Sequence, residues 1–247
     1  MKKTIGLFGA TALAVLMVFL AAACPDDTSK DKGESPYKGE KLVVTNQQLS
    51  EHAVNAHGPT NAYINSSKSG ELLISDQKGN TLGTGTITGG KINFTLNEPG
   101  NKYKIDDEAA FGKAFHDFWD NVTVVEPADD TIEGNDVRMM IFHEDEGIND
   151  LFFREKTVGT KDSVALETIV FIYVNGNCRI KGNAKQGMVP GTGYFSSEDI
   201  DLALEKGWNL VCRKMLYGSE VVGTNIISME IKNLVDFKWA IWVEHPL

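Results

Sequence analysis

The feature that most constrains the fold of this chain is a period-two alternation of apolar and polar side chains. Its clearest instance is LGTGTITGGKINFTL, residues 82–96, where apolar side chains recur at every second position from Ile92 to Leu96. Gly89-Gly90 lies between the two halves, and glycine accepts the positive φ angles of a two-residue hairpin turn without a Cβ clash. The stretch predicts an antiparallel hairpin with one buried face.

The same alternation recurs in short stretches along the rest of the chain and predicts the fold class. Glycine and asparagine separate these stretches at intervals typical of hairpin turns. We therefore expect a mainly β protein, built from antiparallel, sandwich-like units with one amphipathic helix. The expected organisation is a β unit plus helix over residues 41–158 and a sandwich-like unit over residues 159–247.

One strand is expected to lie at the centre of the C-terminal unit. Residues 169–174, IVFIYV, are apolar at successive positions, which indicates a strand covered on both faces. Asn175-Gly176 follows directly and is a strong hairpin signal. We expect the chain to fold back here into a neighbouring strand that contains Cys178.

A single helix is expected over residues 106–121, DDEAAFGKAFHDFWDN. Its aromatic side chains recur at helical intervals, and its first residues are acidic, which suits the positive end of a helix dipole. His116 and Asp117 lie beside the aromatic stripe and could form an acid–base pair. The favoured interpretation is that they are the polar flank of a helix that packs on the core.

The first 23 residues have the order of a secretory signal peptide. Two lysines precede a run of 19 uncharged residues, Ile5 to Ala23, and small residues end this run before Cys24. A spanning helix needs about 20 apolar residues, so length alone does not exclude one. A proline and two aspartates follow Cys24 without a positive cluster, which favours cleavage over a membrane helix.

The sequence at this point resembles the lipobox of bacterial lipoproteins. It reads Ala21-Ala22-Ala23-Cys24, with Ala21 where the family prefers leucine and Leu20 one place earlier. In that family the cysteine sulfur receives a diacylglycerol, and after cleavage the cysteine is residue one of the mature protein. Ordinary signal cleavage at the A-x-A site is the alternative. The strand-and-turn patterns YVNGNCRIKG, LALEKGWNLV and LGTGTITGGKINFTL are similar to uncharacterised lipoproteins of the spirochaete type.

The resemblance implies an exported protein that acyl chains such as palmitate hold to the cell envelope, with the outer membrane as the expected location. Acyl chains contribute about 0.8 kcal/mol per buried CH₂, so several of them hold a chain durably. Residues 24–40 are rich in charged and small residues and are expected to form a disordered tether. Two lysines leave with residues 1–23, so the formal charge falls from -10 to -12, which disfavours nucleic acid as a partner.

Two cysteines of the body are candidates for a disulfide. Once Cys24 is lipidated, Cys178 and Cys212 remain as one even pair. In an oxidising compartment they could form a disulfide. They could equally be buried thiols that fill the core, because the pattern does not show whether their Cα atoms approach within ~7 Å.

An acidic loop between two apolar runs is a weak candidate for a calcium site. Its oxygen ligands would be Glu144, Asp145, Glu146, Asn149 and Asp150. Carboxylates and amides clustered in a loop suit calcium, but the spacing is not that of an EF-hand. A charged hairpin tip without a metal is the favoured interpretation, and no other cofactor is expected.

Candidate contacts for a partner lie in two loops and one late strand. Binding residues concentrate in loops such as 143–150 and the glycine-rich 183–197, which carries Tyr194 and Phe195. Trp242 falls on the polar side of its expected strand, which would offer an exposed indole to a glycan or a protein. The favoured alternative for this tryptophan is that another layer of the protein covers it.

No linear catalytic motif is present, because the chain has no G-x-S-x-G, H-E-x-x-H or paired C-x-x-C. His52 and His57 suit no standard zinc spacing and are expected in a surface loop. We expect a lipid-anchored, non-catalytic binding or adhesion module of the cell envelope, with a host or envelope protein or a glycan as its partner. The alternatives are a structural or assembly subunit of an envelope complex and a hydrolase with a dispersed site.

Overall fold

The computed structural model describes residues 39–55, 58–128, 130–144, 147–155, 159–160, 163–189, 193–218, 224–231 and 237–244. All of them belong to one unit, Glu34–Leu247. The expected signal peptide, Cys24 and most of the expected tether lie outside the described residues. Within the described part of the chain, no helix combines the length and the hydropathy that a bilayer crossing requires.

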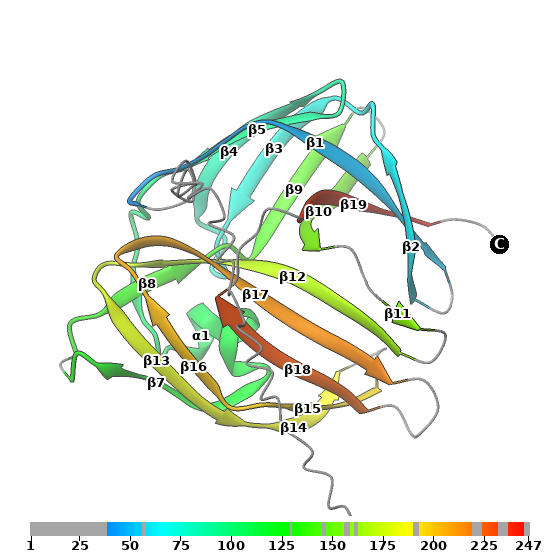
Figure 1. The fold of residues 1–247 in the computed structure, drawn as a ribbon. Coiled ribbons are helices and arrows are strands. Elements are labelled where there is room, and N and C mark those ends of the chain that lie inside the picture. The colour runs from blue at the N-terminus through cyan, green and yellow to red at the C-terminus, as the bar shows by residue number, and fades with distance from the viewer. Residues whose placement is uncertain are drawn as a thin grey trace, which may run out of the picture. The chain divides into compact units, whose positions relative to one another are not determined.

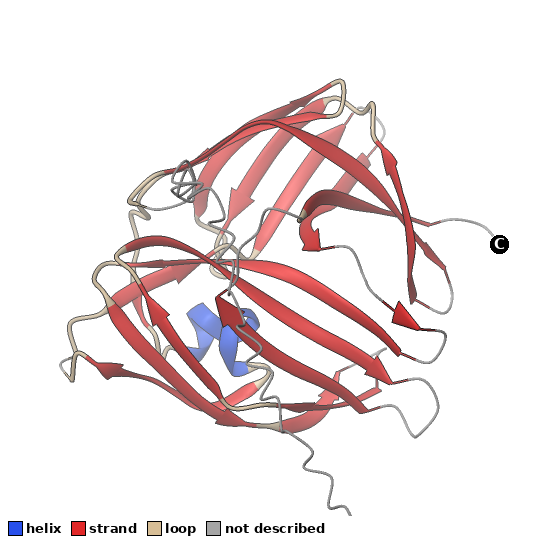
Figure 2. Ribbon diagram, viewed as in Figure 1, coloured by secondary structure: helices blue, strands red, loops and turns tan. Residues whose placement is uncertain are grey.

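The fold is almost entirely β, with one short helix (Figure 2). The first ten strands are β1 (Leu42–Asn55), β2 (Gly58–Asn65), β3 (Gly70–Ser75), β4 (Thr81–Thr88), β5 (Lys91–Leu96), β6 (Tyr103–Lys104), β7 (Trp119–Glu126), β8 (Glu133–Asp136), β9 (Met139–Glu144) and β10 (Gly147–Glu155). The remaining strands are β11 (Gly159–Thr160), β12 (Ser163–Val174), β13 (Cys178–Ala184), β14 (Gln186–Val189), β15 (Gly193–Ser197), β16 (Ile200–Leu204), β17 (Gly207–Gly218), β18 (Thr224–Ile231) and β19 (Lys238–Glu244). The helix α1 (Glu108–Phe111) continues as a π-helical turn, η1 (Gly112–His116). The predicted fold class is confirmed.

Most strands form one large, curled sheet (Figure 1). Its hydrogen-bonded order is β14-β15-β18-β17-β12-β10-β19-β1-β5-β4-β3-β9, and β9 also pairs with β10, so the second half of this order returns on itself. A smaller sheet has the order β16-β13-β7. The described pairs are antiparallel except β1–β19 and β15–β18, which are parallel.

Strand β12 separates two hydrophobic clusters and is buried on both faces, as its sequence predicts. Its odd-numbered side chains from Ile169 to Tyr173 belong to the first cluster, with residues of β1, β3, β4, β5 and β19. Its even-numbered side chains from Val170 to Val174 belong to the second cluster, with residues of the small sheet and of the helix. The two clusters therefore share one strand.

Strands from both sides of residue 158 are interleaved in the large sheet. β19 lies between β10 and β1, with Trp239 opposite Leu49 of β1. β8 and β10, which precede residue 158, both pair with β12, which follows it. The expected units, 41–158 and 159–247, thus share their main sheet.

The helix is shorter than its sequence pattern predicts. Asp107 caps it by accepting hydrogen bonds from two backbone N–H groups of the first turn. η1 ends at His116, and Trp119 already begins β7, which pairs with β13. The expected helix over residues 106–121 is wrong at its end, because pairing of β7 with β13 overrides the helical spacing of the aromatic residues.

The Asn175-Gly176 turn does not close a hairpin. β12 lies in the large sheet, whereas β13, which follows the turn, pairs with β16 and β7 in the small sheet. The N–H of Asn175 donates to the carbonyl of Glu133 at 2.9 Å, and its Oδ1 accepts from the N–H of Glu133 at 3.0 Å. These bonds hold the turn on β8, so it carries the chain from one sheet to the other, and the hairpin prediction is wrong.

His52 is buried in β1, so the expected surface loop around it is wrong. Its ring stacks on Tyr63 of β2 with centroids 4.2 Å apart. β1 continues to Asn55 and pairs with β2, β19 and β5 along its length, which leaves no loop at this point. His57 lies outside the described residues.

The Gly89-Gly90 turn between β4 and β5 gives a testable prediction. Its residues have φ angles of 54° and 75°, as the sequence predicts. A Cβ on Gly90 would lie 1.8 Å from the carbonyl oxygen of Ser66, whereas a Cβ on Gly89 would have nothing within 4 Å. We expect Gly90→Ala to lower the free energy of unfolding by ~3 kcal/mol and Gly89→Ala by only ~1 kcal/mol, because the first variant also forces a backbone shift. Urea denaturation measures both, and equal losses would contradict the packing argument.

Candidate binding surface

Residues 178–204 form one long hairpin that joins the two sheets. β13 pairs with β16 near its base and β14 pairs with β15 near its tip. One register runs through both parts, with Gly182 opposite Ile200 and Met188 opposite Tyr194. The base belongs to the small sheet through β7, and the tip belongs to the large sheet through β18.

The tip of this hairpin carries two exposed apolar side chains on neighbouring strands. Met188 is 67% exposed and Tyr194 is 59% exposed, and each lies directly opposite the other. The other large apolar side chains exposed among the described residues, Val43 and Ile64, lie singly on β1 and β2. Cross-strand neighbours form a continuous apolar surface, which we call the Met188–Tyr194 patch.

The patch is exposed because the hairpin changes which of its sides faces the core. In β13 and β16 the buried side chains are even-numbered, as at Ile180 and Leu202, whereas at the tip the odd-numbered Phe195 is buried. Between the two parts a side chain replaces a backbone acceptor: Asp199 Oδ1 accepts a hydrogen bond from the N–H of Ala184 at 2.6 Å. This irregularity coincides with the change of face.

Phe195 fixes the inner side of the tip. Its ring meets the ring of Phe118 at 75°, with centroids 5.5 Å apart, inside the second cluster. Gly187 lies opposite Phe195, and a Cβ there would lie 2.6 Å from the phenylalanine ring. The inner side is thus packed without space, while the outer side presents the patch.

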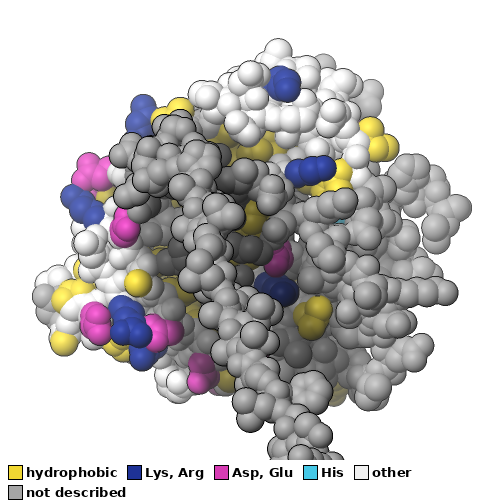
Figure 3. Space-filling model, in the orientation of Figure 1, with side chains coloured by type: hydrophobic (Ala, Val, Ile, Leu, Met, Phe, Trp, Pro, Cys, Tyr) yellow, Lys and Arg dark blue, Asp and Glu magenta, His cyan; other side chains and the backbone are white. Residues whose placement is uncertain are grey.

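The outer face of the hairpin base is charged, in contrast to its tip. Figure 3 shows basic and acidic side chains side by side over this part of the molecule. Arg179 donates two hydrogen bonds to Asp201, the second from Nη2 to Oδ2 at 2.7 Å, and these bonds lower the pKa of Asp201. Glu126 and Lys181 extend this group of charges. Charged residues are depleted at the centre of protein interfaces. The apolar tip is therefore better suited to a partner than the charged base.

Of the residues expected to contact a partner, Tyr194 lies on the patch and Phe195 does not. Phe195 is 4% exposed, because successive residues of a strand face opposite sides, and this candidate contact is therefore a core residue. Trp242 lies in β19 opposite His52, and its side chain is outside the described residues. Sequence reasoning missed Met188, because a lone methionine in a glycine-rich stretch gives no signal before its register is known.

The candidate calcium loop lies between β9 and β10, which pair as a hairpin. Asp145 and Glu146 lie outside the described residues, as do the side chains of Glu144, Asn149 and Asp150. Among the described side chains, no group of three or more His, Cys, Asp or Glu could hold a metal ion. Calcium at this loop stays a prediction.

Cys178 and Cys212 are buried thiols in different clusters. Cys178 belongs to the second cluster and Cys212 to the first, and no disulfide joins them. Burial raises the pKa of Cys178 to about 11, so this thiol stays protonated and unreactive at neutral pH. Of the two alternatives for this pair, the structure has the buried thiols.

A network of hydrogen bonds surrounds the buried carboxylate of Asp76, in the turn between β3 and β4. Its Oδ1 accepts from two backbone N–H groups of the turn. Its Oδ2 accepts from the side-chain amides of Asn80 and Asn135. Asn135 Oδ1 also accepts from the N–H of Asp136 at 2.8 Å, so the network ties β8 to the turn.

Asp136 has the opposite surroundings. It is 1% exposed, and its Oδ1 has no hydrogen-bond partner. It lies opposite Ile172 of β12, which places its side chain on the side of the second cluster. Burial and the charge of Asp76 raise the pKa of Asp136 to about 7, against the opposing effect of Arg138 and Arg213. Asp136 is therefore a core residue that titrates near neutral pH.

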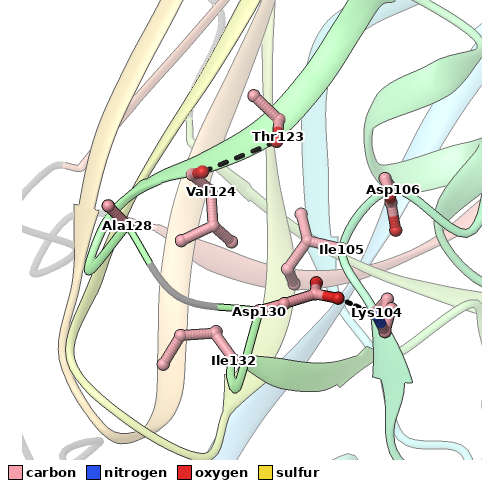
Figure 4. A pocket seen from close by; sticks show the side chains of 8 residues that line it. All are labelled: Lys104, Ile105, Asp106, Thr123, Val124, Ala128, Asp130 and Ile132. Carbon is pink, nitrogen blue, oxygen red and sulfur yellow. Dashed lines mark hydrogen bonds and ion pairs between the residues drawn. The ribbon is translucent and has the colours of Figure 1, made fainter.

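A pocket of about 160 Å³ lies between β7 and the segment before α1 (Figure 4). Its lining residues are Lys104, Ile105, Asp106, Thr123, Val124, Ala128, Asp130 and Ile132. Lys104 and Asp130 form an ion pair, and the hydroxyl of Thr123 donates to the carbonyl of Val124 at 3.5 Å. The pocket is smaller than the ~300–1,000 Å³ of typical ligand sites, and its side chains do not pair a nucleophile with a base.

His116 and Asp117 are each engaged by other groups. His116 Nε2 lies 3.1 Å from the carbonyl oxygen of Ile105. Asp117 forms an ion pair with Lys113 at 3.0 Å. This arrangement agrees with the interpretation of the two residues as the polar flank of a packed helix.

Comparison with known proteins adds no template for this surface. No family model matches the chain, and no curated protein or solved structure is significantly similar to it.

Proposed function

We propose that the protein is a lipid-anchored binding or adhesion module of the bacterial cell envelope, carried at the outer membrane through Cys24. The observation that carries the binding role is the Met188–Tyr194 patch, an exposed apolar pair on a packed hairpin. The anchor is supported by the sequence, in which Cys24 directly follows a run of 19 uncharged residues. The proposed partner is a host or envelope protein or a glycan.

The chemistry of the patch suits recognition. Burying a methionine or an aromatic side chain in an interface contributes about 1.5–3 kcal/mol, and tyrosine is enriched at energetically important contacts. Tyr194 combines an apolar ring with a hydroxyl, which serves a protein or a sugar surface. Since Phe195 and Gly187 hold the hairpin from within, little ordering of the backbone would oppose binding.

A structural or assembly subunit of an envelope complex is the second candidate function. The observation that favours it is the position of β14 at the end of the large sheet, where strands of different subunits can pair. A hydrolase receives less support, because among the described residues the carboxyl whose pKa is raised to about 7, that of Asp136, is 1% exposed and a substrate cannot reach it.

Photo-crosslinking in cells that export the protein tests the binding surface. Tyr194→p-benzoylphenylalanine is expected to give a discrete crosslinked species, whereas the same side chain at the exposed Ala203, on the charged face, is the matched control. Adding Met188→Ser should weaken the crosslink roughly tenfold, because the apolar neighbour is lost. Equal crosslinking at both positions, or none at residue 194, would reject the patch as the binding surface.

The anchor has its own prediction. Cys24→Ala is expected to move the exported protein from the detergent phase to the aqueous phase in Triton X-114 partitioning and to remove the mass of the acyl chains. Cys178→Ala is the matched control, because it changes a buried thiol far along the chain and should leave the acylation unchanged. A wild-type protein that stays aqueous and unacylated would refute the lipoprotein hypothesis.

A further inference from the structure

We propose that β14 receives an added β-strand from the partner, and that this strand is an extended segment in which apolar and basic residues alternate. The inference rests on the proposed binding function and names the chemistry of the partner. It depends on the hydrogen-bonding edge of β14 next to the Met188–Tyr194 patch.

The directions of the backbone N–H and C=O groups of β14 follow from the hydrogen bonds that neighbouring residues of the hairpin make. The N–H of Ser197 donates to the carbonyl of Lys185 at 2.8 Å, so odd-numbered residues bond across the hairpin. The N–H of Glu198 donates to β18 at 2.9 Å, so even-numbered residues of β15 bond to β18. Successive residues direct these groups to opposite sides of a strand. Gln186 and Met188 therefore direct their N–H and C=O groups away from β15, where no strand among the described residues pairs with them.

The open position beside β14 continues the line of β7. That strand pairs with β13 as far as Trp119, which lies opposite Ala184, and before Trp119 the chain leaves the sheet as η1. The end of η1 borders the open position, because the carbonyl of His116 accepts from Lys185 Nζ at 2.8 Å. An added strand would lie in line with β7 and stop at this helical turn.

The two sides of an added strand would meet different surroundings. Residues directly opposite each other in an antiparallel pair share a face, so the residue opposite Met188 would lie beside it on the exposed side. The next residue would point to the inner side, where Lys185 Nζ lies 3.6 Å from Asp120 Oδ1. Apolar residues suit the first position. The Lys185–Asp120 pair leaves no local excess of charge at the second position, so the negative charge of the whole chain favours basic residues there.

Charge favours a basic segment over a second copy of this chain. Next to the open position the local charges balance in pairs, because Lys113 pairs with Asp117 and Lys185 pairs with Asp120. Glu198 and Asp199 follow β15, and Asp199 accepts from the N–H of Ala184, while Arg213 donates to the carbonyl of Lys113 at 3.0 Å. The charge of the whole chain therefore decides the preference. Two copies of the exported chain, each with a formal charge of -12 once residues 1–23 are removed, would repel one another, whereas a basic segment is attracted.

The test uses the exported chain in mild detergent and a labelled, capped octapeptide of alternating valine and lysine. Valines beside Met188 would also direct their N–H groups at β14, because side-chain and backbone directions alternate together. N-methylation of the valines should therefore weaken binding at least about tenfold, while N-methylation of the lysines should leave it within about twofold. Replacement of the lysines by glutamates should also weaken it at least about tenfold at low salt. Fluorescence anisotropy measures all four peptides.

Two variants separate strand addition from the wider binding function. Gln186→Pro removes an N–H that the sheet does not use and blocks the edge, so it should abolish peptide binding at an unchanged melting temperature. Tyr194→Ser keeps the edge and should weaken peptide binding by less than Gln186→Pro. Equal binding of the two N-methylated peptides, or full binding by Gln186→Pro, would overturn strand addition even if the crosslink at residue 194 persists. A β14-dependent dimer that excludes the peptide would overturn it as well, because the edge would then belong to a second copy.

Discussion

Replacing Asp136 with asparagine is expected to stabilise the protein at pH 8 and to flatten the dependence of its stability on pH. The carboxyl is 1% exposed, and its Oδ1 lacks a hydrogen-bond partner. Burial is the first cause of its raised pKa, the charge of Asp76 is the second, and Arg138 and Arg213 oppose both. An amide of the same shape carries no charge at any pH, so it avoids the cost of an ionised group in the second cluster.

The sign follows from the two pKa values of Asp136, about 7 in the folded protein against 3.8 for the ordinary group. Below pH 3.8 both states hold the proton, and the wild type has its full stability. Between the two values the folded state holds a proton that the unfolded chain releases, so stability falls as pH rises. Above pH 7 the loss is complete, and at 1.36 kcal/mol per pKa unit it amounts to about 4 kcal/mol.

Urea denaturation of wild type and Asp136→Asn between pH 4.5 and 8.5 measures this effect. The variant should gain on the wild type steadily up to about pH 7 and reach an advantage of about 2–4 kcal/mol at pH 8. Asp106→Asn is the control, because that carboxylate is exposed, and its effect should stay within about 0.5 kcal/mol. Parallel pH profiles for Asp136→Asn and wild type would show that the carboxyl does not titrate in this window.

Local pattern predicted much of this fold because the relevant signals lie within a few residues of one another. The glycines at 89 and 90 have the positive φ angles that their turn requires. Ile169 to Val174 are buried on both faces, because a strand with no polar side needs two layers of cover. Such features depend on neighbours along the chain, so the sequence carries them directly.

Pairing between distant segments could not be predicted in this way. β1 and β19 run parallel although nearly the whole chain separates them, and no turn residue records that contact. At Asn175 the local signal favoured a hairpin, but hydrogen bonds to Glu133 of β8 direct the chain into the other sheet. The helix also ends earlier than expected because of a distant segment: Trp119 begins a strand that pairs with β13.

The candidate surface was predictable in part. Tyr194 lies in a glycine-rich segment, where binding residues concentrate, and its side chain is exposed as a contact residue must be. Phe195 next to it is buried, and the difference depends on the change of face near Asp199, which leaves no periodic signal. Asp136 was not predictable, because its neighbours Gly134 and Asn135 make the stretch resemble a polar turn.

Replacing Trp239 with alanine is expected to destabilise both hydrophobic clusters together. The indole packs on Phe171 of β12, with ring centroids 6.0 Å apart and nearly parallel planes, and on Phe94 of β5 at 5.2 Å. Loss of a buried tryptophan costs about 3–5 kcal/mol. Because β12 carries side chains of both clusters, loss of its support in the first cluster should be transmitted to the second.

Amide hydrogen exchange distinguishes this outcome from independent unfolding of the two clusters. In Trp239→Ala, protection of Ile180 in β13 and of Ile200 in β16 should fall by the same free energy as global stability, although both residues belong to the second cluster. Trp239→Phe is the matched control and should cost less than half as much, because the ring contact with Phe171 persists. Two separate unfolding transitions, with exchange in β13 and β16 unaffected, would mean that the two hydrophobic clusters unfold independently although β12 carries side chains of both.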